Sequence, residues 1–448
     1  MKTGKIFRGD KTIWVVFLLL SIISLVAVYS SIGLYAYSMP GTRPTGLFLK
    51  HLAIVAATYV AIILISRINY RYFSRFAMLG YWASLVLLAV MLALHGRWFH
   101  LPVIGQFQPS EIAKVVLIIF VARQLSINAK KGLTDELGTF LMLLVYILPV
   151  VLLVLPENFS TAALIFLSAY LVMLYGGVNR KYWWSLLLLV VFIGSVAMFV
   201  MLKTGQSSDV LERSETWVNR VDRWLHPNPD ELSQENMAKM AIARGGVARL
   251  GIGSTVHARL MTQAHNDFIY AIIIEETGML GGLLVFALYS IFFFRCIRLS
   301  LKCKGRFGSL TVAGLGTMIY MQALVNMCVA VGVLPVTGQT LPFISYGGTA
   351  YLFLGCALGV IQSVAADVDD AETAALAGET AGKEKTPFLF SFFVLVAKFA
   401  SQHRQYRQIV VSITHVFTSF YHIHKVFFDT LPVYFWLFLV FYILLSKT

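Results

Sequence analysis

Asp267 is the residue whose type and position point most directly to chemistry. It stands immediately before an apolar run, in the stretch His265-Asn-Asp-Phe-Ile-Tyr270. A carboxylate at this boundary is able to act as general base for a sugar hydroxyl, provided that the positive end of the following helix does not lower its pKa too far. The alternative is that Asp267 is an N-cap, which needs no catalytic role.

Two further carboxylates follow on the same predicted helix. At about 100° per residue, Glu275 is rotated about 80° from Asp267 and lies about 12 Å deeper, whereas Glu276 points to the opposite side. We therefore expect Glu275 to line the same cavity as Asp267, and Glu276 to form an interhelical ion pair. The alternative is that both carboxylates are structural, either neutral or paired inside a helical bundle.

A second polar segment is Gln108-Pro-Ser-Glu-Ile-Ala-Lys114. Ser110 is predicted to cap the helix that starts here, and Glu111 and Lys114 lie one turn apart on the same face. Such a pair is able to neutralise itself at a helix start. The functional alternative is that Lys114, together with Arg97, supplies cations for an anionic head group such as a pyrophosphate.

The third polar segment starts with Gln322 and Asn326 and continues through residues 332–348. Two prolines and four glycines among the last 17 residues break any regular helix. Irregular backbone at membrane depth is tolerated only against protein or a water-filled cavity, so we predict a re-entrant loop; the alternative is an ordinary extracytoplasmic turn. Such a loop suits a sugar or phosphate, and its expected binding residues are Thr337, Ser345, Tyr346, Gly347 and Gly348.

The composition shows what kind of protein must position these residues. With 58% hydrophobic residues, 13% charged residues and a mean hydropathy of +0.75, the chain is expected to be an integral membrane protein. Disordered chains and soluble enzymes are excluded. An outer-membrane barrel is also excluded, because the apolar runs are continuous over about 17 to 25 positions instead of alternating.

We predict an all-α polytopic membrane protein with ten transmembrane helices and a long structured extracytoplasmic loop between spans 7 and 8. In this loop, residues 203–266, Ser233 is predicted to cap a helix that runs through residues 240–243. A preceding amphipathic helix is expected on the outer leaflet, with Trp217, Val221, Trp224 and Leu225 on one face and Arg213, Arg220 and Arg223 on another. The ten spans lie near residues 13–34, 49–66, 77–94, 111–127, 137–155, 160–177, 182–202, 267–294, 309–334 and 347–366.

Lys and Arg residues set the orientation of these spans. With the N-terminus in the cytoplasm, the short outer loops hold only Arg43, Lys50 and Arg97, and the inner segments hold far more basic residues. This asymmetry explains the formal charge of +14 without a nucleic-acid partner. The domains predicted from these patterns are a cytoplasmic N-terminus (1–12), a membrane domain (13–366), a cytoplasmic linker (367–387) and an atypical aromatic-rich extension (388–448).

Four motifs in order resemble those of the SEDS family, the FtsW, RodA and SpoVE proteins of bacterial cell-wall synthesis. They are Arg97-Trp98, Gln108 to Lys114, Asn266 to Gly278, and Leu334 to Gly348, within a region of about residues 13–366. The resemblance implies a glycosyltransferase of the bacterial cytoplasmic (inner) membrane that polymerises lipid II on the outer face. It also implies a class B penicillin-binding protein as partner, and Asp267 as the catalytic residue.

The implied reaction assigns roles to the polar residues. Asp267 would take the proton of the acceptor GlcNAc 4-hydroxyl as this oxygen attacks C1 of the donor MurNAc. Undecaprenyl pyrophosphate leaves, and cations such as Arg97, Lys114 and one of the loop arginines, or a divalent cation (Mg²⁺ or Mn²⁺), would stabilise its charge. No organic cofactor is expected, and the sequence shows no metal-ligand cluster. The expected substrate-binding residues are Arg97, Glu111, Lys114, Glu275 and the five loop residues at 337 and 345–348.

One departure from the family pattern lies before span 6. Asn158 stands where the family has the aspartate of Pro-Asp-x-Gly-Thr, and Glu157 beside it is expected to be a solvated boundary residue. His265 and Thr340-Leu-Pro favour the division branch, FtsW, which implies other divisome proteins as partners. Two alternatives to an enzyme are a lipid II flippase, whose key charges should lie at the membrane midplane, and a non-catalytic scaffold for the crosslinking enzyme.

Overall fold

The computed structural model describes most of the chain up to residue 378. The predicted seventh span beyond residue 188, much of the long loop, and the extension at 388–448 lie outside the described residues. The described residues are 7–37, 44–94, 99–101, 105–133, 136–188, 220–226, 233–249, 251–253, 255–257, 261, 265–346 and 348–378.

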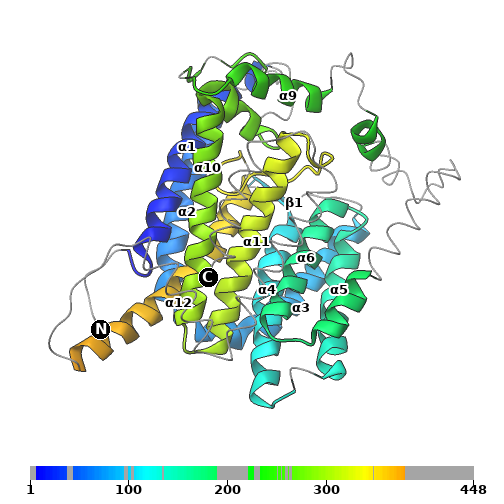
Figure 1. Cartoon of the computed structure of the whole chain (residues 1–448), viewed down its shortest axis with the longest axis vertical. Coiled ribbons are helices and arrows are strands. Elements are labelled where there is room, and N and C mark those ends of the chain that lie inside the picture. The colour runs from blue at the N-terminus through cyan, green and yellow to red at the C-terminus, as the bar shows by residue number, and fades with distance from the viewer. Residues whose placement is uncertain are drawn as a thin grey trace, which may run out of the picture. The chain divides into compact units, whose positions relative to one another are not determined.

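The regular secondary structure of the described chain is helical, apart from one short antiparallel hairpin in which Phe99 pairs with Phe107 (Figure 1). The hairpin consists of β1 (Phe99–Leu101) and β2 (Gly105–Phe107). The helices are α1 (Lys11–Tyr37), α2 (Pro44–Arg67), α3 (Arg71–Ala93), α4 (Pro109–Lys130), α5 (Leu137–Val154), α6 (Phe159–Tyr175), α9 (Gln234–Gly245), α10 (Ile269–Lys302), α11 (Arg306–Ala330) and α12 (Thr349–Gly378).

The helices confirm a multi-pass membrane protein. Within the described residues, eight helices are long and apolar enough to cross a membrane, and α6 is a shorter apolar helix of 17 residues. The predicted seventh span begins as a helix at residues 180–188 and then leaves the described part of the chain. The count of ten spans therefore stays a prediction.

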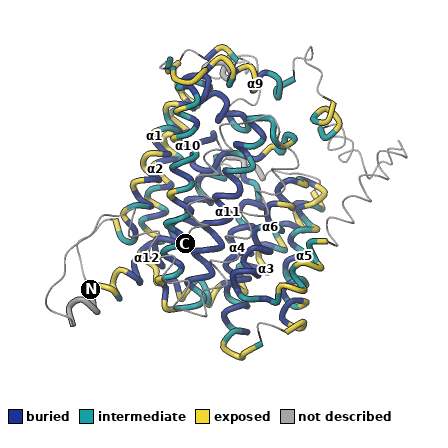
Figure 2. The backbone as a smooth tube through the Cα atoms, viewed as in Figure 1, coloured by how far each residue is buried: buried dark blue, intermediate teal, exposed yellow. Residues whose placement is uncertain are grey.

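Burial separates central helices from peripheral ones (Figure 2). In α11, 83% of the apolar window is buried, against 22% in α2. The exposed side chains of α2 and α3 are large and apolar, such as Leu64 and Leu79, as expected of surfaces that face lipid tails. Helix α11 packs against α4, α6 and α10, and small residues such as Gly314, which lies against Val172 and Ile118, allow this close approach.

The N-terminal segment, the end of α10 and the end of α12 meet at one end of the bundle. Arg8 pairs with Asp370 at 2.9 Å, and Lys302 pairs with Glu372 at 2.7 Å. At the same end, Gln362 of α12 clamps the start of α1: its Oε1 accepts from the Asp10 N–H at 2.8 Å, and its Nε2 donates to the Asp10 carbonyl at 3.2 Å. Segments predicted to share the cytoplasmic side therefore lie together.

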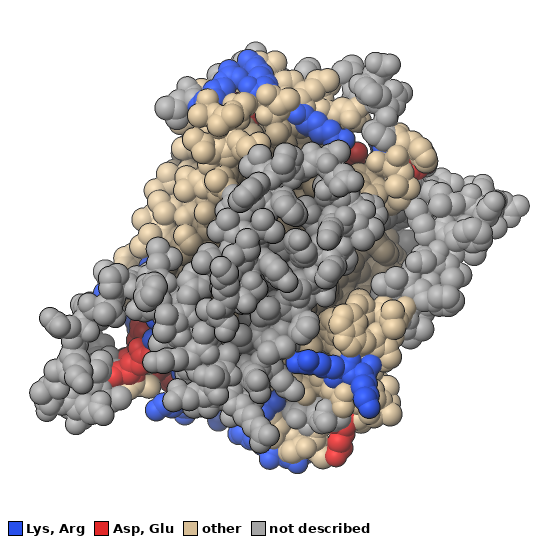
Figure 3. All heavy atoms as spheres, viewed as in Figure 1, with Lys and Arg blue, Asp and Glu red and all other residues tan. Residues whose placement is uncertain are grey.

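Basic side chains gather at both ends of the bundle. In the described part of the face shown in Figure 3, Lys and Arg side chains lie at the two ends, and other residues lie between them. Helix α12 continues to Gly378, so the first part of the predicted linker at 367–387 is helical. The reason is its composition, because the alanines and glutamate at 371–377 are strong helix formers.

Helix α10 is broken at Gly278, close to the end of the bundle that lies away from the Lys302–Glu372 pair. Gly278 has φ 77° and ψ −178°, a conformation that is almost restricted to glycine, and a Cβ there would lie 2.7 Å from Cα of Ala248. The freed backbone groups pair with the segment after α9: Met279 N–H donates to the Gly246 carbonyl at 2.9 Å, and Gly251 N–H donates to the Glu276 carbonyl at 2.9 Å. This segment therefore closes over the break.

Candidate active site

The stretch at 332–348, for which a re-entrant loop is predicted, has irregular backbone in its described residues, and much of it is buried. Leu341, Phe343 and Ile344 are almost fully buried, and Phe343 has a positive φ of 61°. The loop contacts protein, as irregular backbone within a membrane bundle requires, and is not an ordinary exposed turn. It also holds the chain before α10, because the Tyr346 N–H donates to the His265 carbonyl at 3.0 Å.

The Ser345 hydroxyl is occupied by this same attachment. It donates to the Asn266 carbonyl at 2.6 Å and accepts from the Leu341 N–H at 2.8 Å. A hydroxyl that already holds two backbone groups has little capacity left for a ligand. The prediction that Ser345 binds substrate is therefore not supported, and its role is to join the loop to the segment that carries Asp267.

Asp267 does not cap α10. The N-cap position is Phe268, and no side chain makes a cap hydrogen bond there. The Asp267 carbonyl instead accepts from Nδ2 of Asn326 at 2.8 Å. Its carboxylate lies beside the loop, since a Cβ at Gly338 would be 3.8 Å from Oδ2. The N-cap alternative is thus wrong, and the carboxylate remains available for chemistry.

The environment of Asp267 suits a general base. Burial raises the pKa of the Asp267 carboxyl to about 6, and the nearby Arg220 guanidinium opposes this rise. A base whose pKa lies close to neutrality combines a populated charged form with a useful driving force for proton transfer. Burial also lowers the pKa of His265 to about 4, so this neighbour is neutral at pH 7.

Arg220 reaches the site from a short helix at residues 220–225. Its Nη1 donates to the Val336 carbonyl at 3.2 Å, and Nε1 of Trp224 donates to the Gly332 carbonyl at 3.1 Å. The two residues are four positions apart and share a face, so the prediction that Arg220 and Trp224 occupy different faces was wrong. Both side chains hold the short helix on the 332–336 backbone. Arg213 and Trp217 lie outside the described residues.

Lys114 and Glu111 form a buried ion pair. Lys114 Nζ lies 2.7 Å from Glu111 Oε2, and the two side chains are 1% and 7% exposed. Lys114 also donates to Oε1 of Gln322 at 2.8 Å. The self-neutralising interpretation of this pair is therefore supported, and direct contact with an anionic substrate is not. The prediction that Ser110 caps α4 is wrong, because the helix starts at Pro109 and no side chain caps it.

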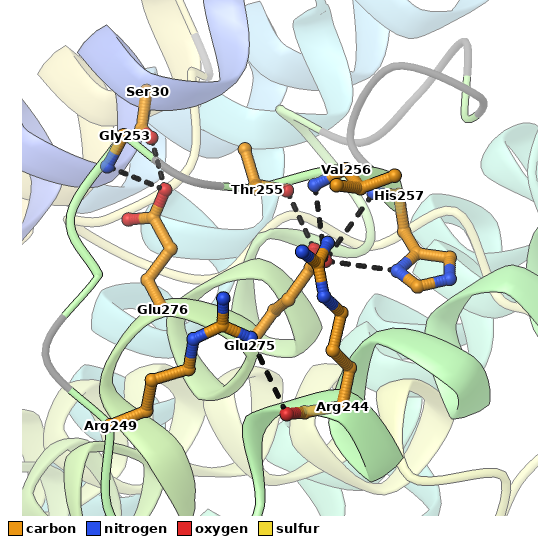
Figure 4. A network of polar contacts seen from close by, with 9 residues as sticks. All are labelled: Ser30, Arg244, Arg249, Gly253, Thr255, Val256, His257, Glu275 and Glu276. Atoms are coloured by element: carbon orange, nitrogen blue, oxygen red, sulfur yellow. Dashed lines mark hydrogen bonds and ion pairs between the residues drawn. The ribbon is translucent and has the colours of Figure 1, made fainter.

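Glu275 belongs to a different network from Asp267 (Figure 4). Its carboxylate accepts hydrogen bonds from Arg244 at 3.0 Å, from the Thr255 hydroxyl at 2.6 Å and from His257 Nδ1 at 2.9 Å. Its oxygens are thus occupied by the segment that closes over the α10 break. The expectation that Glu275 shares the Asp267 cavity and binds substrate is not supported.

Glu276 has hydrogen-bond donors around it where an ion pair was predicted. Its Oε1 accepts from the Ser30 hydroxyl of α1 and from the Gly253 N–H (Figure 4). The predicted interhelical ion pair is wrong, because among the described residues α1 contributes the Ser30 hydroxyl and no cation at this position. The two adjacent carboxylates therefore tie the segment at 253–257 to α10 and α1.

Three further residues predicted to bind substrate are Arg97, Thr337 and Gly347. Arg97 and Gly347 lie outside the described residues. Oγ1 of Thr337, next to Gly338, is buried and has no hydrogen-bond partner among the residues that the structure describes. Unlike the Ser345 hydroxyl, the Thr337 hydroxyl therefore keeps its hydrogen-bonding capacity.

Two polar side chains of α11 hold the loop, and although the sequence placed both at the start of the polar segment, it predicted no contact for them. Nδ2 of Asn326 donates to the Gln339 carbonyl at 2.7 Å, and Nε2 of Gln322 donates to the Thr340 carbonyl at 3.0 Å. Their spacing is the signal that could have predicted a shared role, because two amides four residues apart share one face of an otherwise apolar helix.

Asn158 has a structural role at the start of α6. Its Oδ1 accepts from the Thr161 N–H at 3.1 Å, which is an N-cap bond that asparagine and aspartate make equally well. The hydroxyl of Thr161 in turn accepts from Nε2 of Gln339 at 2.7 Å. Glu157 is only 7% exposed, so the expectation of a solvated boundary residue was wrong.

Comparison with known proteins identifies relatives along most of the chain. The chain is 26% identical over 366 residues to "Peptidoglycan glycosyltransferase MrdB" of Escherichia coli (strain K12), covering 79% of this chain and 93% of that protein. It is 30% identical over 355 residues to "Probable peptidoglycan glycosyltransferase FtsW" of Bacillus subtilis (strain 168), covering 76% and 86%.

Solved structures show the same fold. A chain from "Structural coordination of polymerization and crosslinking by a peptidoglycan synthase complex" matches with a TM-score of 0.63 and 24% identity, covering 80% of this chain and 98% of that one. The crystal structure of the rod shape determining protein RodA of Thermus thermophilus matches with a TM-score of 0.57 and 21% identity, covering 80% and 97%. Residues 10–369 also match the family FTSW_RODA_SPOVE, described as "Cell cycle protein". The chain therefore belongs to the FtsW/RodA/SpoVE family, the SEDS proteins.

Proposed function

We propose that this protein is a peptidoglycan glycosyltransferase that polymerises lipid II, with Asp267 as its general base. The observation that carries the proposal is the Asp267 carboxyl, which caps no helix, lies beside Gly338 and has a pKa raised to about 6 by burial. The names of the relatives at 26% and 30% identity support the reaction class.

The reaction exchanges one bond to a sugar carbon for another. The 4-hydroxyl oxygen of the acceptor GlcNAc attacks C1 of the donor MurNAc, and the bond from C1 to the pyrophosphate oxygen breaks. Undecaprenyl pyrophosphate leaves with the electron pair, and Asp267 takes the hydroxyl proton. A carboxylate with a pKa of about 6 is largely deprotonated at pH 7, so it starts each cycle as a base.

Arg220 is the described cation that we assign to the developing negative charge. Its guanidinium is near enough to Asp267 to lower the pKa of that carboxyl, and it is held against the loop through Val336. A planar guanidinium suits a pyrophosphate because its N–H groups match pairs of phosphate oxygens. In this proposal Arg220 takes the role that the buried Lys114 is not placed to fill.

A divalent cation is also part of the proposal. Among the described residues, no group of three or more His, Cys, Asp and Glu side chains lies together as a ligand set. A resident ion held by protein alone does not fit these residues. Mg²⁺ is usually bound by one or two carboxylates, waters and substrate phosphates, so we propose that it arrives with the pyrophosphate, and no step above depends on it.

The proposed setting is the bacterial inner membrane, with the N-terminus in the cytoplasm and Asp267 at the outer end. The charge asymmetry of the loops supports this orientation. The joined ends of α1, α10 and α12 support it too, because the segments predicted to be cytoplasmic lie at one end of the bundle and the loop with Asp267 at the other.

A class B penicillin-binding protein is the proposed partner. The structural relative at TM-score 0.63 comes from a complex described as coordinating polymerization and crosslinking. His265 and the Thr340-Leu-Pro stretch favour the division branch, and with it other divisome proteins. A flippase is less well supported, because Glu275, the charge that the sequence placed near the membrane midplane, is bound by Arg244 and Thr255 of the segment that closes over the α10 break, close to one end of the bundle.

The direct test is a reconstituted synthesis. The purified protein, its penicillin-binding partner and lipid II are combined with Mg²⁺ or with EDTA, and glycan strands are separated by gel electrophoresis. We expect strands that lengthen with time when Mg²⁺ is present. If lipid II instead only crosses the bilayer of proteoliposomes and no strand forms, the protein is a carrier and the proposal is wrong.

Arg220→Ala is expected to move the pH dependence of this synthesis. Arg220 lowers the pKa of Asp267, so its removal raises that pKa, and the base then deprotonates only at higher pH. The rise of kcat with pH should therefore shift upward from about pH 6, and kcat should also fall because the leaving group loses a cation.

The measurement is kcat between pH 5 and 8, with Arg220→Lys and Arg223→Ala as comparisons. Arg220→Lys keeps the charge and should restore most of the original pH dependence. Arg223 is exposed on the same short helix, so Arg223→Ala should behave like the unaltered protein. An unchanged pH profile in Arg220→Ala would contradict the assigned proximity of Arg220 to the base.

A further inference from the structure

Asn326 joins the two pieces of backbone that meet at the candidate base. Its Nδ2 donates to the Asp267 carbonyl at 2.8 Å and to the Gln339 carbonyl at 2.7 Å. Gln339 directly follows Gly338, and the Asp267 carboxylate lies beside Gly338. One amide nitrogen therefore sets how far Asp267 stands from the loop that faces its carboxylate.

The chemistry of the two contacts fixes the orientation of the amide. Both partners are carbonyl oxygens, which only accept hydrogen bonds, so the NH₂ group of Asn326 must point at them. Its two N–H bonds match the two acceptors. A side chain without both donors would leave at least one of these carbonyls without its hydrogen bond. Water is not placed to replace that bond, because Asn326 is only 1% exposed.

A second amide on α11 holds the loop one turn away. Gln322 donates to the Thr340 carbonyl at 3.0 Å and accepts from Lys114 at 2.8 Å. Adjacent loop residues are thus held by two side chains of one helix, which is anchored in turn to the ion pair on α4. Only Asn326 of these two also holds Asp267.

From this geometry we infer that Asn326 is a positioning residue for Asp267, which sets the placement of the carboxylate against the 337–340 loop during glycosyl transfer. The inference rests on the proposed function. Asn326 touches main-chain atoms of Asp267 and not its reacting oxygens, so it acts through Asp267. A small displacement of a reacting group is enough to lower kcat by about 100-fold, whereas substrate binding elsewhere in the site is preserved.

The test compares Asn326→Ala with the unaltered protein in the full complex with its penicillin-binding partner. We expect kcat to fall about 100-fold and KM for lipid II to stay within about threefold. The rise of kcat with pH should also move to lower pH. The released carboxylate gains solvent, its pKa falls from about 6 towards that of an ordinary aspartate, and Arg220 is still present to favour the charged form.

Gln362→Ala is the matched control for a purely structural amide. Gln362 is fully buried and also bridges two main-chain groups, the N–H and the carbonyl of Asp10, at the opposite end of the bundle. Its loss should lower thermal stability to a similar extent as the loss of Asn326. It should leave the pH profile unchanged and kcat per folded molecule within about threefold.

The outcomes separate this inference from the proposed function. If Asn326→Ala and Gln362→Ala both lose activity only in proportion to the unfolded fraction, with unchanged pH profiles, Asn326 is structural and the inference is overturned. If Asp267→Asn is inactive in the same assay and Asn326→Ala is not, the function stands and the positioning role fails. If Asp267→Asn is fully active, the function itself fails, and the inference fails with it.

Discussion

Asp267→Asn is expected to lower the rate of glycan-strand synthesis by about 10²- to 10⁴-fold, the usual contribution of a general base. The substitution keeps the shape of the side chain and removes its ability to take the hydroxyl proton. The main-chain bond from Asn326 to the Asp267 carbonyl is unaffected, and α10 does not depend on this side chain for its cap. The variant should therefore fold, insert and bind its partner normally.

The measurement is strand synthesis from lipid II by the complex, with thermal stability and partner co-purification measured on the same preparation. Asp222→Asn is the matched control, because Asp222 is an exposed aspartate on the short helix that carries Arg220. It should retain the full rate. Strand synthesis at the normal rate by Asp267→Asn would show that another group takes the proton and would exclude the mechanism proposed here.

Lys114→Ala is expected to destabilise the protein by about 3–5 kcal/mol, the usual cost of removing one partner of a buried ion pair. Lys114 is 1% exposed, so its loss leaves the Glu111 carboxylate buried without its cation, and Gln322 loses the donor at its Oε1. The measurement is the free energy of unfolding in detergent by denaturant titration. The loss of activity per folded molecule, converted to a free energy, should be smaller than the loss in the free energy of unfolding.

A double variant tests the cause of this loss. Lys114→Met combined with Glu111→Gln removes both charges and keeps much of the buried volume, so it should be more stable than Lys114→Ala alone. If Lys114→Ala keeps its stability but loses activity, the lysine contacts the pyrophosphate, and the structural interpretation is wrong.

Local patterns in the sequence predicted the features that depend on neighbouring residues. Ser233 was predicted to cap a helix, and it does cap α9 through the Asn236 N–H. The glycines and prolines of 332–348 predicted an irregular loop, and the structure has one. Such features are predictable because a cap or a helix break needs only the residues within one or two turns.

Some failed predictions were local, such as the Ser110 cap of α4, but those for Glu275 and Lys114 depended on a distant part of the chain. Helical rotation placed Glu275 near the side of Asp267, but a segment about 20 to 30 residues earlier in the chain folds over the break at Gly278 and binds its carboxylate. Lys114 had two interpretations in the sequence. The choice between them depends on Gln322, which is 208 positions away.

The sequence by itself determined that the chain is a membrane protein of the FtsW/RodA/SpoVE type, and it singled out Asp267. Hydrophobic runs, basic loops and ordered motifs are properties of short stretches, so they can be recognised without knowledge of the fold. Only the tertiary structure decided which polar groups surround that carboxylate. Asn326 lies 59 positions from Asp267, and Arg220 comes from a separate segment before α9. Their meeting depends on how helices and loops pack, which no local pattern records.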